Sequence, residues 1–147
     1  MANRSKAKGS SFESQCVSYL RERLGQEQIE RRALHGSRDM GDVYNLRADD
    51  ATGIVECKNV VRYGPADVEK WREQTVAERK NAGADFALLV IHRPGCGRAR
   101  FGMNRCDMQL RDLDVIAGDR FTCLMGDSMT DMWVTMTVDE ACGIIDR

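Results

Sequence analysis

Three charged residues in the first half of the chain have the types and the spacing for divalent-metal chemistry. Asp42 precedes a short apolar run, and Glu56 and Lys58 lie two residues apart within segment 54–59. Because side chains alternate faces along a β-strand, Glu56 and Lys58 should point to the same side. Carboxylate oxygens are the ligands that Mg²⁺ prefers, and a neighbouring ammonium suits an anionic substrate. This spacing predicts a small metal site.

A β-hairpin is expected to carry these residues. Asp42 opens the first strand, which continues through the apolar residues of segment 43–46. Segment 49–53 is predicted to be a tight connection, because Asp and Gly tolerate turn backbones. Segment 54–58 is then the second strand, and the hairpin should bring Asp42 beside it.

This pattern has a counterpart in a known group of nucleases. Asp42, followed after a hairpin by Glu56-Cys57-Lys58, resembles the D…(D/E)-x-K site of the PD-(D/E)XK nuclease superfamily. More narrowly, residues 10–103 are similar to Holliday-junction resolvases of the archaeal type and their bacteriophage relatives. Gly41 stands where the superfamily often has Pro. The residues that carry the narrower resemblance are Glu13, Arg31, Arg32, Ser37, Gly41, Asp42, segment 55–59, Trp71 and Gln74.

The resemblance implies a fold, a reaction and a set of site residues. The fold would be an α/β restriction-endonuclease-like core, with a mixed central β-sheet flanked by helices. The reaction would be Mg²⁺-dependent hydrolysis of DNA phosphodiesters, with Mn²⁺ able to substitute, leaving 5′-phosphates. The substrate would be a four-way junction cut by a homodimer. Asp42, Glu56, the Cys57 carbonyl and Glu13 would hold the metal, with Lys58 as a further catalytic residue. Candidate DNA contacts are Arg31, Arg32, Ser37, Arg38, Lys70 and Gln74.

Length and composition set bounds on the architecture. The 147 residues suffice for one domain with a core, predicted over residues 10–147 after a flexible basic arm, 1–9. Within it, 10–103 would form the nuclease core and 104–147 the C-terminal strands and helix. No apolar run approaches the ~20 residues of a membrane span. Six cysteines without a C-x-x-C pair argue against a zinc site and indicate free thiols in a reducing cytoplasm, bacterial or that of a bacteriophage host.

Charge is distributed unevenly along a chain whose net charge is only −1. The number of Lys and Arg residues less the number of Asp and Glu residues is 8 − 4 = +4 over residues 1–38 and 2 − 5 = −3 over 39–61. It is 9 − 5 = +4 over 62–105 and 3 − 9 = −6 over 106–147. Basic segments therefore flank the acidic centre, as an enzyme with internal metal ligands and external phosphate contacts requires.

Hydrophobic periodicity and turn residues predict the remaining elements. The run 86–91 is continuously apolar, which is typical of a strand covered on both faces and joined to 54–58 by a parallel crossover. Trp71 is expected to anchor its helix on the sheet. Segment 106–117 is open between strand and helix, with its leucine spacing favouring helix. The other expected elements are a helix over 12–24, a strand over 28–34, a helix over 66–81, a strand over 99–103, a hairpin of 121–125 with 132–137, and a helix over 139–145.

Several readings stay open from the sequence. Glu13 either assists the metal or is a first-turn acid favoured by the helix dipole. Lys58 either orients a water, deprotonates it or stabilises the phosphorane. The apolar hairpin 121–137 forms a dimer contact or completes the monomer core. Competing functions are another nuclease of the same fold, a non-catalytic DNA-binding module, and an interaction protein with a chance Glu-x-Lys.

Overall fold

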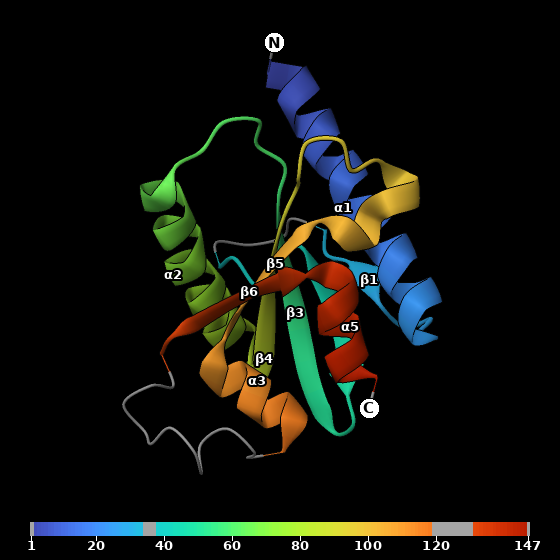
Figure 1. Cartoon of the computed structure of the whole chain (residues 1–147), viewed down its shortest axis with the longest axis vertical. Coiled ribbons are helices and arrows are strands. Elements are labelled where there is room, and N and C mark those ends of the chain that lie inside the picture. Colours follow the sequence, from blue (N-terminus) through green and yellow to red (C-terminus); the bar gives the residue numbers. More distant parts are fainter. Residues whose placement is uncertain (1, 34–37, 119–130, 147) are drawn as a thin grey trace.

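A six-stranded mixed β-sheet forms the centre of the computed structural model, which describes residues 2–33, 38–118 and 131–146 (Figure 1). The strands lie across the sheet in chain order. β3 and β4 run parallel, and the other neighbouring pairs are antiparallel. The strands are β1 (Glu30–Arg31), β2 (Val43–Ala48), β3 (Ala51–Lys58), β4 (Phe86–Ile91), β5 (Arg105–Gln109) and β6 (Trp133–Thr137).

Helices cover both faces of this sheet, so the predicted α/β class with a mixed sheet and flanking helices is confirmed. α2 lies on one face, and α1 and α5 lie on the other (Figure 1). The helices are α1 (Ala2–Leu24), α2 (Pro65–Ala82), the 3₁₀ helix η1 (Arg98–Met103), α3 (Leu110–Ala117) and α5 (Val138–Ile145). The predictions for 66–81 and 139–145 are thus confirmed within a residue.

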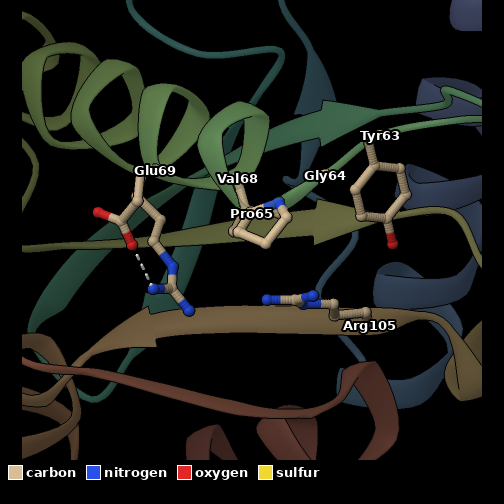
Figure 2. Close-up of a pocket in the computed structure, with 7 residues that line it drawn as sticks. Tyr63, Gly64, Pro65, Val68, Glu69 and Arg105 are labelled. Carbon is tan, nitrogen blue, oxygen red and sulfur yellow. Dashed lines mark hydrogen bonds and ion pairs between the residues drawn. The ribbon is translucent and has the colours of Figure 1, made fainter.

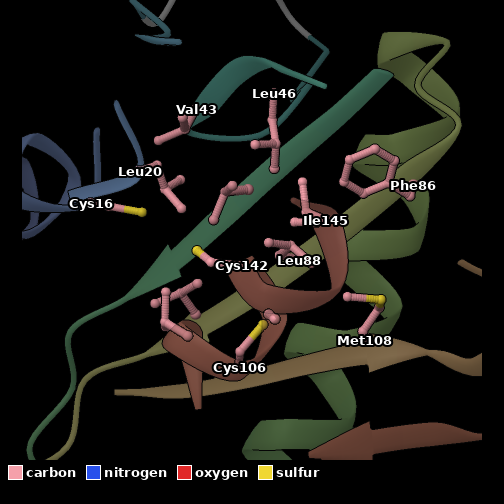
Figure 3. Close-up of a cluster of buried hydrophobic side chains, with 14 of the residues drawn as sticks. Cys16, Leu20, Val43, Leu46, Phe86, Leu88, Cys106, Met108, Cys142 and Ile145 are labelled. Carbon is pink, nitrogen blue, oxygen red and sulfur yellow. The ribbon is translucent and has the colours of Figure 1, made fainter. Parts of the chain in front are cut away.

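The two faces of the sheet differ in polarity. Between the sheet and helices α1 and α5 lies the main core, which includes Leu20, Leu88 and Cys142 (Figure 3). Under α2 the apolar cluster is small, with Val68, Leu89 and Ile91 fully covered and Trp71 only partly so. Trp71 packs against Tyr63 with ring centroids 5.2 Å apart. The rest of the inner surface of α2 buries polar side chains, namely Thr75, Glu78 and Arg79.

The burial of β4 explains why its sequence is a continuous apolar run. All six of its residues are buried, because α2 covers one face and the main core covers the other. A strand without a solvent side loses the alternation of apolar and polar residues and becomes a continuous apolar run. β4 pairs in parallel with β3 from Gly53↔Phe86 to Lys58↔Ile91, as predicted.

Elements near the N-terminus differ in length from the predictions. α1 begins at Ala2 and not near Ser10, so segment 2–9 is helical and not a flexible arm. The side-chain amide of Asn59 donates to the Lys8 carbonyl over 3.4 Å, a tertiary contact that lies outside a sequence window. β1 has two residues where a strand over 28–34 was expected.

Tertiary contacts also decide the structure after β4. The predicted strand 99–103 is the 3₁₀ helix η1, because Phe101 packs into the main core with its ring centroid 5.3 Å from that of Phe12. Segment 106–117 divides into the end of β5 and helix α3 at Leu110. Of the predicted hairpin, 132–137 corresponds to β6, and 121–125 lies outside the described residues. Among the described helices, none is both long and apolar enough to cross a membrane.

Candidate functional site

Alternation along β3 places Glu56 and Lys58 on the face that α2 covers. Val55 and Cys57 point into the main core on the opposite face. The Lys58 Nζ lies 2.9 Å from Oε1 of Glu56, with only 19% and 4% of the two side chains exposed. The predicted pair on a common face is therefore a half-buried ion pair under α2.

Gln74 of α2 completes this contact. Its Oε1 accepts a hydrogen bond from Lys58 Nζ over 3.0 Å, and its Nε2 donates to Glu56 Oε1 over 3.3 Å. The same Nε2 donates to Oε1 of Glu78, one helical turn further on, over 2.8 Å. The predicted placement of Gln74 near the site agrees with this geometry, and its contact with DNA stays a prediction.

A group of three carboxylates surrounds this network. Oxygen atoms of Asp39, Glu56 and Glu78 all lie within 4.8 Å of one another. Glu56 and Glu78 are 3% and 1% exposed, and Oε2 of each has no hydrogen-bond partner. Two buried oxygens without donors are costly unless a proton or a cation satisfies them.

Asp39 and Glu78 were not among the residues predicted for the site. Glu78 had a signal in the sequence, because its spacing from Val68 and Thr75 places it on the buried side of α2. A carboxylate at a buried helix position is unusual unless it is paired or binds a metal. Asp39 had none, since it lies in the loop before β2 and its position depends on the path of that loop. Its backbone carbonyl accepts a hydrogen bond from the Asn81 side chain over 2.9 Å.

Asp42 lies beside this group and is held by the backbone of β3. Its amide donates to the Val55 carbonyl over 3.0 Å, and its Oδ2 accepts from the Cys57 amide over 2.8 Å. The Cys57 amide, and not its carbonyl, is thus the atom in contact with Asp42. The carbonyl as a metal ligand stays a prediction.

Gly41 makes this approach possible. Its φ is +89°, a conformation closed to proline, whose ring holds φ near −65°. A Cβ at this position would lie 2.9 Å from Cδ1 of Ile54. The chain therefore enters β2 by a route that the superfamily's common Pro could not follow.

Glu13 and Arg31 form a second ion pair at the site margin. Arg31 Nε lies 2.8 Å from Oε2 of Glu13, and its Nη2 donates to the Ser10 hydroxyl over 2.7 Å. Burial and the charge of Asp42 raise the pKa of Glu13, and Arg31 offsets part of this. Glu13 therefore lies close enough to Asp42 for their charges to interact, while the charge of Arg31 is already compensated. A role of Glu13 in holding a metal stays a prediction.

The electrostatics of the central carboxylates follow from crowding and burial. Burial, followed by the charges of Asp42 and Glu78, raises the pKa of Glu56 well above its usual range. Burial, with the charge of Asp39, raises the pKa of Glu78 to about 7. For Lys58, burial lowers the pKa, but Glu56, Asp42 and Glu78 outweigh it and the net shift is upward. The site concentrates more negative charge than Lys58 neutralises.

The other predicted DNA contacts do not join the carboxylates. Arg32 stacks on Tyr44, with its guanidinium carbon 4.5 Å from the ring centroid. Arg38 and Lys70 are exposed. Ser37 lies outside the described residues.

A separate pocket of about 360 Å³ opens where α2 begins, between that helix and β5 (Figure 2). It contains two guanidiniums, from Arg72 and Arg105. Both contact the buried carboxylate of Asp107 at 2.7 to 2.9 Å, and Arg72 also contacts Glu69 at 2.8 Å. These arginines are charge-compensated and line no part of the carboxylate group.

The residues present fit a hard divalent cation. Oxygen ligands about 2.1 Å from Mg²⁺ lie at most about 4.2 Å apart, close to the spacing of the three carboxylates. Asp39, Glu56 and Glu78 could hold such an ion, and the charge of Asp42 lies close enough to raise the pKa of both Glu56 and Glu13. Comparison of the chain with protein-family models, with curated proteins and with solved structures gives no match.

Proposed function

We propose that this chain is a divalent-cation-dependent endonuclease that hydrolyses DNA phosphodiesters, with four-way junctions as its substrate. The observation that carries the proposal is Glu56, almost fully buried, with one oxygen on Lys58 and the other without a donor. Asp39, Asp42 and Glu78 add negative charge around it. A buried acid cluster beside one lysine is expensive for stability and is explained by a bound cation next to an anionic substrate.

Each residue has a role in this proposal. Glu56 and Glu78, with Asp39 or Asp42, would hold Mg²⁺, or Mn²⁺ in its place. A bound divalent ion lowers the pKa of a water and neutralises charge that develops on the phosphoryl group. Gln74 holds Lys58 and Glu56 in one orientation through hydrogen bonds to both. The Lys58 side chain is 19% exposed, and its ammonium is then available to a non-bridging phosphate oxygen.

The restriction-endonuclease-like core belongs to the same proposal, supported by the mixed sheet with Glu56 and Lys58 at the end of a central strand. A four-way junction has approximate two-fold symmetry, so paired cuts require two sites related by C₂ symmetry, as in a homodimer. Met132, half exposed immediately before β6, is a candidate contact between protomers. A cytoplasmic location accords with the free thiols of Cys16, Cys57, Cys96, Cys106 and Cys142.

Cleavage of synthetic DNA tests the proposal. Wild-type protein is incubated in Mg²⁺, and separately in Mn²⁺, with a four-way junction, a flap and a linear duplex of matched sequence. Glu56→Gln is expected to lower the rate about 100-fold or more, equivalent to several kcal/mol of lost charge stabilisation. Glu73→Gln, on the exposed side of α2, serves as the matched control and should keep the wild-type rate.

Three outcomes would contradict parts of this reading. DNA binding by the wild type without cutting in either metal would indicate a non-catalytic module. Equal cutting of all three substrates would indicate a general nuclease and not a resolvase. Unchanged cleavage by Asp42→Ala or Glu56→Gln would remove the carboxylates from the reaction.

A further inference from the structure

Three segments of the chain contain basic residues and no acidic residue. They are segments 1–12, 57–66 and 86–106, and together they contain nine Lys and Arg residues. The chain as a whole carries 22 basic and 23 acidic residues, so these segments are a strong local departure from its composition.

The fold brings these three segments to one end of the molecule. Asn59 donates to the Lys8 carbonyl, which links the second segment to the first. The His92 amide donates to the Lys58 carbonyl over 2.9 Å, and the His92 ring meets Phe12 edge to face at 5.5 Å. In Figure 1 the start of α1, the β3–α2 connection and the β4–η1 connection all lie above the sheet, in the upper part of the view.

Six cations of these segments are exposed, and none of them forms an ion pair with a described carboxylate. Of the other cations in these segments, Lys58 and Arg105 are paired with Glu56 and Asp107, and the side chain of Arg4 lies outside what the structure describes. We call the six the basic face. They are Lys6, Lys8, Arg62, Arg93, Arg98 and Arg100.

We propose that the basic face binds the sugar-phosphate backbone of a nucleic acid and feeds it to the carboxylate site. Lys58 is the last residue of β3, so the basic face begins where the site ends. Unpaired cations spread over three segments match a row of phosphates, which attracts them without reading base sequence. The inference deepens the proposed function and takes the identity of the polymer from it.

Two of the predicted DNA contacts already have partners within the protein. Arg31 is committed to Glu13, and Arg32 to the ring of Tyr44. Arg38 precedes Asp39, which contacts Asn81 near the C-terminal end of α2, away from the basic face.

An anionic membrane surface is the main rival partner. The same segments expose the apolar residues Val60, Val61 and Met103, and basic surfaces with apolar tips can also bind lipid headgroups. Membrane-binding surfaces of this kind usually lie along one amphipathic helix, whereas these cations come from the start of α1, two loops and the 3₁₀ helix η1. That distribution favours a polymer that passes over several elements.

The test is binding without chemistry. Fluorescence anisotropy in EDTA measures the affinity for a labelled four-way junction at NaCl concentrations from 50 to 300 mM. Six phosphate contacts on duplex arms predict a slope of log K against log[salt] of about −5. The double variants Lys6→Gln/Lys8→Gln and Arg62→Gln/Arg93→Gln should each reduce the slope by about 2 and weaken binding at 0.1 M salt roughly 50-fold.

The matched control removes two exposed cations from the opposite end of the sheet. Arg47 and Lys80 lie near the β2–β3 turn and the end of α2, where Asp49, Asp50 and Asp85 gather. Arg47→Gln/Lys80→Gln should leave the slope and the affinity unchanged. Circular dichroism melting of all three double variants confirms that each is folded.

The outcomes separate this inference from the proposed function. Equal losses in the control and in the basic-face variants, or a slope shallower than −2, would overturn the inference. Binding to phosphatidylserine vesicles that depends on the basic face, without junction binding, would overturn it in favour of a membrane partner. The expected slopes in EDTA with no cleavage in Mg²⁺ or Mn²⁺ would support it and refute the nuclease. If the basic-face variants cleave DNA and bind it with unchanged affinity, the nuclease would be supported and the basic face refuted.

Discussion

Glu78→Gln is the substitution for which the structure predicts the most specific effect. Glu78 is 1% exposed, its pKa is raised to about 7 by burial and by Asp39, and its Oε1 accepts the Gln74 amide. Glutamine keeps the shape and the oxygen that accepts from Gln74, removes the ionisation, and places an amide donor at the second oxygen, which has no partner. The variant therefore isolates the cost of the charge.

The sign and size follow from proton linkage. The folded protein binds this proton more tightly than the unfolded chain, so the contribution of Glu78 to metal-free stability is most favourable below pH 4.5 and is lost as the pH rises to about 7. The difference between about 7 and the ordinary 4.5, at about 1.4 kcal/mol per pH unit, corresponds to about 3 kcal/mol. Glu78→Gln should match the wild type near pH 4.5 and exceed it by up to about 3 kcal/mol at pH 8.

Urea unfolding at pH 4.5, 6 and 8 in EDTA measures this effect. Adding Mn²⁺ at pH 8 should stabilise the wild type, since a ligand of the folded state adds to stability by mass action, and should stabilise Glu78→Gln much less. Glu73→Gln, exposed on the same helix, should stay within about 0.5 kcal/mol of the wild type throughout. A Glu78→Gln protein that is less stable at pH 8, or whose stability depends on pH as the wild type's does, would refute the reasoning.

Two further substitutions test how the sheet is held. Asp112→Ala removes the carboxylate that lies 2.7 Å from the buried Arg79 guanidinium, and this should lower the free energy of unfolding in urea by about 3–5 kcal/mol. Asp146→Ala, at the exposed C-terminal cap of α5, is the control. Equal losses in the two variants would contradict the argument. Gly53→Ala places a Cβ in steric conflict with the Phe86 ring across the β3–β4 pair and should lower the melting temperature clearly, by more than Gly64→Ala, whose Cβ meets no atom within 4 Å.

Local chemistry in the sequence was sufficient for several elements. β4 was predicted to its ends because both of its faces are buried, and α2 because Pro65 begins it and Gly83, at φ 63°, ends it. Glu56 and Lys58 were placed on one face by the alternation of a strand alone. In each case the determining interactions lie within a few residues of the chain, so a short window contains them.

Other features required contacts between distant residues. The strand expected at 99–103 became a 3₁₀ helix because Phe101 packs against α1, more than 80 residues earlier in the chain. The acidic centre gained Asp39 and Glu78 because a loop and a helix converge on β3. The basic face likewise exists only where three segments meet.

Residue types and strand alternation were enough to identify the side chains that could perform chemistry and to place Glu56 and Lys58 on one strand face. The carboxylates around them, and the cations without an ion pair among the described residues, depend on how the elements pack together. The difference lies in the range of the interactions. Backbone preference and side-chain alternation act within a few residues, whereas burial and charge pairing depend on every element that packs against a group, wherever it lies in the chain.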